Sequence, residues 1–180
     1  MNLANWITII RILVVPFFII LLTYEWKILA LLLFCIAGIT DGVDGYIARS
    51  RRLKTELGSI LDPLADKFLL ISSFVMLSIK NPKLIPLWFT IILLSRELVI
   101  IMGAVIIQFI TNNFKAKPTV LGKITTALQV LTVFVALTMN GVEVALPIKA
   151  LSVFIILTTI FTITSGSHYI YLGTKQLNGG

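Results

Sequence analysis

Charged side chains are scarce in this chain of 180 residues, of which only 13% are charged and 58% are hydrophobic. A soluble domain carries about a quarter charged residues and about half apolar ones. The mean hydropathy of +1.02 therefore excludes an ordinary soluble protein and predicts an integral membrane protein. We expect a single domain over residues 1–180.

Cysteine and histidine occur only once each, as Cys35 and His168. One cysteine allows no disulfide within the chain, and the lone histidine has no partner with which to ligate a metal. The net charge of +7 comes from basic residues in short loops between apolar runs. This distribution sets the topology of membrane proteins, so we expect no nucleic-acid partner.

Long apolar runs are abundant, and six of them approach the ~20 residues that cross the hydrocarbon core as a helix. Open β-structure is excluded because its edges would be unsatisfied in lipid. The sequence therefore predicts an all-α integral membrane protein with six transmembrane helices. Because Arg11 interrupts the first run, we expect no cleavable signal peptide. The predicted spans are Trp6–Leu22, Ile28–Ala48, Gly58–Ile79, Leu84–Ile110, Leu121–Met139 and Ala145–Tyr171.

The loops are unequally charged on the two sides of the membrane. Six spans put both termini on one side, where the loops carry eight basic residues, against four on the other side. The positive-inside rule then predicts a multi-pass protein of the inner (cytoplasmic) membrane with its termini facing the cytoplasm. The eight are Arg49, Arg51, Arg52, Lys54, Lys115, Lys117, Lys123 and Lys175, and the four are Lys27, Lys80, Lys83 and Lys149.

Acidic residues number only eight, yet four of them stand at the facing ends of the second and third runs. Asp41 and Asp44 are three apart, and Asp62 and Asp66 are four apart, so each pair shares a helix face. Four converging carboxylates repel one another unless they are protonated or bind cations. Oxygen ligands suit Mg²⁺ or Mn²⁺, and four carboxylates suffice for two ions that clamp a transferring phosphoryl group.

Small residues and one arginine surround the aspartates in a pattern that fits a phosphate ligand. Gly45 and Gly58 remove side chains where a ligand could approach the backbone. The small side chain of Ala48 leaves room for a ligand on the same face, and Arg49 can hold a diphosphate through two hydrogen bonds. Plain helix caps do not explain the pattern, because Asp41 and Asp44 lie at the C-terminal end of a helix, where the dipole disfavours them.

The complete spacing Asp-x₂-Asp-Gly-x₂-Ala-Arg-x₈-Gly-x₃-Asp-x₃-Asp resembles the signature of the CDP-alcohol phosphatidyltransferase family. The signature is met by Asp41, Asp44, Gly45, Ala48, Arg49, Gly58, Asp62 and Asp66. The resemblance implies that Asp41, Asp44 and Asp62 ligate two metal ions, and that Asp66 completes the second site and acts as general base. It also implies that Gly45, Ala48, Gly58 and Arg49 contact the nucleotide of CDP-diacylglycerol, and that the protein is a homodimer among membrane lipids.

Five further residues are candidates for binding. Asn5, Thr8 and Arg11 are spaced by three and resemble the start of the phosphatidylglycerolphosphate synthases of this family, which implies contact with the donor nucleotide. Arg96 is expected to contact a carboxylate or a substrate phosphate. Glu97 is not its expected partner, because neighbours on a helix point about 100° apart. Lys123 is expected to contact the acceptor.

The acceptor alcohol is less clearly marked than the donor. The first 80 residues resemble the synthases that use glycerol 3-phosphate, which we place first. Ala104 stands where those enzymes usually carry an arginine, and the run 117–126 resembles the cardiolipin synthases of the family, whose acceptor is phosphatidylglycerol. A divalent metal transporter is the remote alternative, since acidic residues in spans can mark ion paths.

Overall fold

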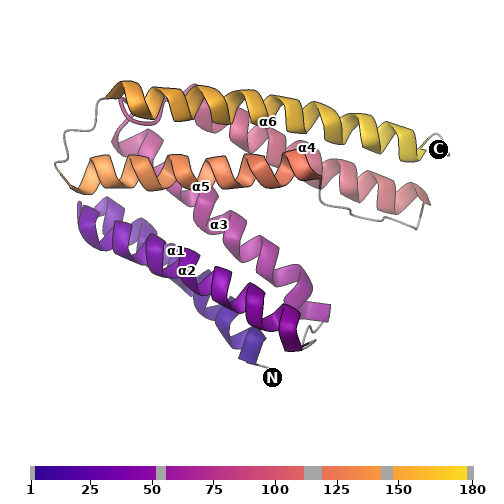
Figure 1. Ribbon diagram of the computed structural model, residues 1–180, viewed down its shortest axis with the longest axis horizontal. Helices are drawn as coiled ribbons and strands as arrows, with labels where there is room; N and C mark the ends of the chain where they lie inside the picture. The colour runs from indigo at the N-terminus through magenta and orange to yellow at the C-terminus, as the bar shows by residue number, and fades with distance from the viewer. Residues whose placement is uncertain (1–2, 52–55, 112–118, 143–147, 178–180) are drawn as a thin grey trace. The chain divides into compact units, whose positions relative to one another are not determined.

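A computed structural model describes the backbone of residues 3–51, 56–111, 119–142 and 148–177, and the side chains of 13–40, 67–110, 119–142 and 148–176. The described residues form six α-helices and no strand, which confirms the all-α prediction (Figure 1). The helices are α1 (Leu3–Thr23), α2 (Lys27–Arg51), α3 (Glu56–Lys80), α4 (Leu87–Thr111), α5 (Val120–Gly141) and α6 (Ile148–Leu177).

Among the described residues, three helical segments are long and apolar enough to cross a membrane. They are Leu87–Ile110, Val120–Gly141 and Ile148–Gln176. The described parts of α1 and α2 add shorter apolar stretches at Leu13–Thr23 and Lys27–Thr40. Only 28% of the apolar window of α4 is buried inside the protein, as expected for a helix whose outer face contacts lipid.

The start of the fourth span differs from the prediction. The sequence predicts a start at Leu84, whereas α4 begins at Leu87. Pro86 explains the shift, because a proline disfavours helical backbone in the residue before it. The Pro86 carbonyl instead accepts hydrogen bonds from the Phe89 and Thr90 amides, at 3.1 and 3.4 Å, and so starts the helix.

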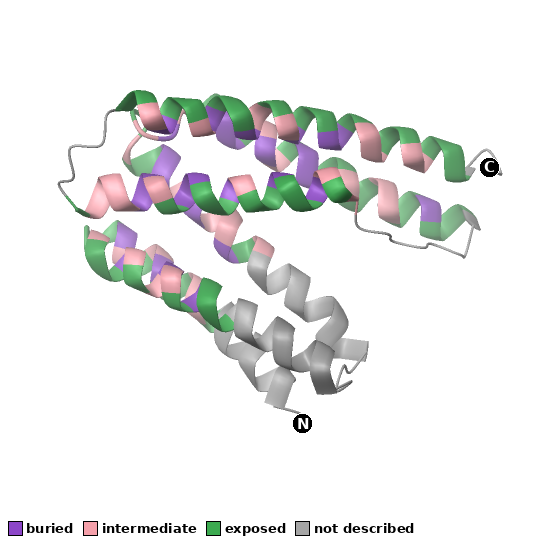
Figure 2. Cartoon of the chain, viewed as in Figure 1, coloured by how far each residue is buried: buried purple, intermediate pink, exposed green. Residues whose placement is uncertain are grey.

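The last helix extends six residues beyond the predicted end at Tyr171, to Leu177. Its 30 residues would span about 45 Å, which exceeds the ~30 Å of the hydrocarbon core. Hydropathy identifies only the part of a helix that lies in lipid, so it did not predict that the helix continues through the more polar residues after Tyr171. Buried and exposed positions alternate along this helix (Figure 2).

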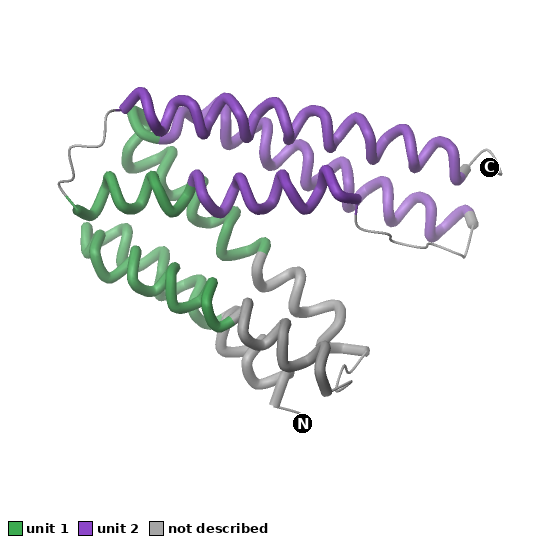
Figure 3. Tube along the Cα trace, viewed as in Figure 1, with its two compact units in different colours: residues 1–84, 133–146 green, residues 85–132, 147–180 purple. Residues whose placement is uncertain are grey.

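The described contacts divide the chain into two compact units (Figure 3). Unit 1 comprises Met1–Leu84 and Val133–Leu146, and within it α1 packs against α2 and α3. Unit 2 comprises Ile85–Thr132 and Pro147–Gly180, and within it α4 packs against α6. The helix α5 therefore contributes its first part to unit 2 and its last part to unit 1.

Polar contacts join the helix ends of unit 1 at the side opposite to the aspartates. The Lys80 ammonium donates to the Thr23 carbonyl at the end of α1, at 3.1 Å. Asn81, directly after α3, donates through Nδ2 to Oδ1 of Asn140 in the last turn of α5, at 2.7 Å. A Cβ on Gly141 would lie 3.3 Å from the Lys27 carbonyl, so the ends of α5 and α2 approach closely.

The hydrogen bond between Asn81 and Asn140 should contribute measurably to stability. Replacing Asn81 by alanine should lower the free energy of unfolding by about 1 kcal/mol, because a half-buried amide loses its partner. Unfolding by SDS in lipid–detergent micelles measures this change. Asn140→Ala and the double variant complete the cycle, and additive effects of the two single changes would show that the bond contributes nothing.

Candidate active site

Four aspartates occupy the parts of α2 and α3 that lie next to the connection between these helices. Asp41 and Asp44 belong to the last three turns of α2, and Asp62 and Asp66 belong to the first three turns of α3. The backbone is helical at all four positions, so the spacings of three and four residues correspond to about one helical turn. The four side chains themselves lie outside the described residues.

The donor set of these aspartates suits hard divalent cations. All four groups are carboxylates, the ligands that Mg²⁺ and Mn²⁺ prefer, and each helix supplies two of them within about one turn. Among the side chains that the structure does describe, no group of three or more His, Cys, Asp or Glu could hold a metal ion. The chain thus has no competing candidate in its described part.

The predicted nucleotide contacts belong to the same unit. Gly45, Ala48 and Arg49 lie in α2, and Gly58 lies in the first turn of α3. Asn5, Thr8 and Arg11 follow one another at intervals of three residues in α1, a helix that packs against both α2 and α3. The side chains of all seven residues lie outside the described part of the chain.

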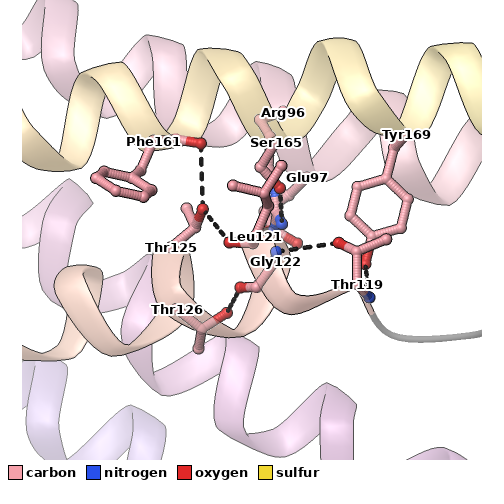
Figure 4. Close-up of polar contacts among 10 residues, drawn as sticks. All are labelled: Arg96, Glu97, Thr119, Leu121, Gly122, Thr125, Thr126, Phe161, Ser165 and Tyr169. Carbon is pink, nitrogen blue, oxygen red and sulfur yellow. Dashed lines mark hydrogen bonds and ion pairs between the residues drawn. The ribbon is translucent and has the colours of Figure 1, made fainter.

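A buried polar cluster in unit 2 is centred on Arg96 of α4 (Figure 4). Its guanidinium group contacts the Glu97 carboxylate and donates from Nη2 to the Ser165 hydroxyl, at 3.0 Å. The same guanidinium lies over the ring of Tyr169, with Cζ 5.7 Å from the ring centroid. Arg96 and Glu97 are only 8% and 7% exposed, so the pair is held inside the unit.

The pairing of Arg96 with Glu97 corrects the prediction that these neighbours are not partners. Their Cα–Cβ bonds diverge on the helix, but both side chains are long enough to bend toward each other. A buried charge without a partner costs several kcal/mol, which outweighs the modest cost of bending two flexible side chains. The expectation that Arg96 contacts a carboxylate is correct, with Glu97 as that carboxylate.

The first turn of α5 carries the second predicted acceptor contact, Lys123, whose side chain is exposed. Thr119 is the N-cap of this helix, because its hydroxyl accepts a hydrogen bond from the Gly122 amide at 3.0 Å. The Lys123 amide donates to the Thr119 carbonyl at 3.1 Å. Lys123 is therefore held through its backbone by the N-cap.

The profile of the CDP-alcohol phosphatidyltransferase family matches residues 1–164, a range that includes all eight signature positions. This chain belongs to that family. It is therefore a membrane-bound transferase of phospholipid biosynthesis, and the dependence of the family on divalent metal ions agrees with the carboxylate donor set.

Several relatives cover different shares of the chain. A protein of Bacillus subtilis named CDP-diacylglycerol–glycerol-3-phosphate 3-phosphatidyltransferase is 34% identical over 93% of this chain and 93% of its own length. A Pseudomonas fluorescens protein of the same name is 38% identical, covering 56% of this chain and 53% of its own. A probable phosphatidylglycerophosphate synthase of Mycobacterium tuberculosis is 39% identical, over 54% and 48% of the two lengths.

Ser165, Tyr169 and Thr119 were not among the predicted site residues. A signal for the first two was available, because Thr158, Thr162, Ser165 and Tyr169 recur at intervals of four, three and four residues, which is the period of one helix face. In a span, such a polar face points toward other helices. Thr119 stands directly before the fifth apolar run, which is the usual place for an N-cap.

Proposed function

We propose that this protein transfers the phosphatidyl group of CDP-diacylglycerol to the hydroxyl of glycerol 3-phosphate, giving phosphatidylglycerol phosphate and CMP. The observation that carries the proposal is the Bacillus subtilis relative, which is named for this reaction and matches this chain over 93% of both lengths. Other relatives named for the same reaction support the acceptor, including a Haemophilus influenzae protein that is 36% identical over 55% of this chain.

The aspartates would hold the metal ions. Asp41, Asp44 and Asp62 would ligate two Mg²⁺ or Mn²⁺ ions, and Asp66 would complete the second site. When bound, two divalent cations neutralise the negative charge of a diphosphate and orient its oxygens. Both helices that carry these residues belong to unit 1, which supports a shared site.

The chain's own groups would carry out the transfer. Asp66 would take the proton of the acceptor hydroxyl while that oxygen attacks the phosphorus bearing diacylglycerol. The bond from this phosphorus to the CMP oxygen breaks, and CMP leaves with the electron pair. Arg49 would contact the donor phosphates, beside Gly45, Ala48 and Gly58. Since CMP is a good leaving group, positioning and charge neutralisation suffice without a nucleophilic Ser or Cys.

The remaining binding residues would secure the two substrates. Asn5, Thr8 and Arg11 would contact the donor nucleotide from α1, and Arg96 and Lys123 would contact the acceptor. One observation supports a ligand near Arg96. Its Nε–H is buried and has no hydrogen-bond partner among the described residues. Buried donors normally find a partner, so water or a ligand would satisfy this one.

The membrane setting follows from the charge distribution. The termini and the aspartates would face the cytoplasm at the inner membrane, where the loops carry the excess of basic residues. A homodimer remains a prediction of the family resemblance.

An acceptor assay tests the proposal. Purified protein in lipid nanodiscs, given labelled CDP-diacylglycerol with Mg²⁺ or Mn²⁺, should release CMP only when glycerol 3-phosphate is added, and chelation by EDTA should abolish the release. Cardiolipin formed from phosphatidylglycerol, with glycerol 3-phosphate unused, would overturn the acceptor but keep the transfer reaction. Uptake of divalent metal into vesicles without any lipid product would overturn both.

A further inference from the structure

Tyr169 of α6 lies against the start of α5, on the helix that carries Lys123. Its phenolic oxygen accepts a hydrogen bond from the amide of the N-cap residue Thr119, at 3.3 Å. The same oxygen would lie 2.9 Å from a Cβ placed on Gly122, closer than real Cβ contacts allow. The tyrosine thus hydrogen-bonds to the N-cap residue of α5 (Figure 4) and lies close to Gly122 in the first turn.

Tyr169 also contacts Arg96 through its ring. The guanidinium group lies 5.7 Å from the ring centroid of the tyrosine, and Ser165, one turn earlier on α6, accepts a hydrogen bond from the same group. A buried cation over an aromatic ring contributes more than an exposed one, because water does not compete for it. A chain of contacts therefore runs from α4 through α6 to the first turn of α5.

Lys123 is the last residue in this chain of contacts. Its amide donates a hydrogen bond to the Thr119 carbonyl, whereas its side chain is exposed and therefore accessible to a ligand. A second link between α5 and α6 lies one turn further, where the Thr125 hydroxyl shares its one hydrogen between the Leu121 carbonyl of its own helix, at 2.8 Å, and the Phe161 carbonyl of α6, at 3.1 Å. The buried hydroxyls of Thr132 and Thr158, 2.9 Å apart, also join α5 to α6, so loss of the phenol is expected to affect only the first turn of α5.

We propose that Tyr169 is a positioning residue that fixes the N-cap of α5 and thereby the backbone from which Lys123 reaches the acceptor. The inference rests on the proposed function only in assigning Lys123 to the acceptor. Tyr169 touches no substrate in this role, and its phenol acts through Thr119 and Gly122. Loss of the phenol should therefore weaken acceptor use while leaving donor use unchanged.

The test is Tyr169→Phe in nanodiscs, which removes only the oxygen. We expect the KM for the acceptor to rise about threefold to tenfold, the effect of one lost hydrogen bond, with the KM for CDP-diacylglycerol within twofold of the original. Hydrogen exchange at the Thr119 amide should accelerate. Tyr171→Phe is the matched control, because Tyr171 stands two residues away on α6 and is 63% exposed.

Two outcomes of this test overturn the inference. One is an acceptor KM within twofold of the original, and the other is an equal rise in both KM values, which would indicate a general structural effect. Failure of the proposed function is seen separately, because the unmodified protein would then not use glycerol 3-phosphate at all. In that case the acceptor that it does use replaces glycerol 3-phosphate in the comparison.

Gly122→Ala gives an independent test from the other side of the contact. The added methyl group would lie 2.9 Å from the Tyr169 phenolic oxygen and 3.1 Å from Oγ1 of Thr119, so it would disturb the same N-cap. The acceptor KM should therefore rise as in Tyr169→Phe, and the two changes combined should not fully add. Gly103→Ala is the control, since a Cβ on that residue of α4 meets no atom within 4 Å. Full additivity of the two effects would contradict the shared mechanism.

Discussion

Asp66→Asn is expected to lower kcat by about 10²- to 10⁴-fold, the usual contribution of a general base. The amide is nearly the size of the carboxylate but cannot accept the proton of the acceptor hydroxyl. Binding of CDP-diacylglycerol should change little, because the other three aspartates and Arg49 remain. Release of labelled CMP measures the turnover, and equilibrium binding of the donor in nanodiscs measures the affinity.

Asp62→Asn separates the base from the metal ligands. This carboxylate is assigned only to metal, so its loss should raise the Mn²⁺ concentration needed for half-maximal activity, and added metal should restore part of the rate. Excess metal should not rescue Asp66→Asn. If Asp66→Asn keeps a kcat within threefold of the original, the assignment of the base is wrong.

Glu97→Ala is expected to lower the free energy of unfolding by about 3–5 kcal/mol, because it leaves the Arg96 guanidinium buried without its counter-ion. Ser165 is a neutral hydroxyl and cannot replace the lost charge. Reversible unfolding by SDS in lipid–detergent micelles measures the loss.

The double variant Arg96→Met with Glu97→Leu is the control for this prediction. Removing both charges together removes the buried cation as well, so stability should return to that of the original protein or exceed it by about 1–4 kcal/mol. A Glu97→Ala variant that loses less than about 1 kcal/mol would show that water reaches the pair in the membrane, as at an exposed salt bridge.

Helices were the most predictable part of this protein, because each lies in a long apolar run whose length is dictated by the bilayer. The observed bounds of α5, Val120–Gly141, differ by only one or two residues from the predicted 121–139. The early start predicted for α4 and the short end predicted for α6 arose where hydropathy says little, at Pro86 and in the polar turns after Tyr171.

The candidate site could be predicted only in part. The aspartate signature is local in sequence, so its spacing identified the family without any tertiary information. The cluster around Arg96 depends on which faces of α4 and α6 meet, and no spacing within one helix determines that. The counter-ion of Arg96 was also wrongly predicted. Glu97 was excluded because adjacent residues on a helix point in different directions, yet it is the carboxylate that pairs with Arg96.

Each compact unit is built from two separate stretches of the chain, and this has a consequence for synthesis at the ribosome. Residues 1–84 of unit 1 emerge first, but Val133–Leu146 follow only after roughly fifty residues of unit 2. At about 5–20 residues per second this takes several seconds. The first three helices must therefore persist in the membrane as an incomplete assembly, because Asn140, the partner of Asn81, is not yet synthesised. Neither unit can be completed before part of the other has been synthesised.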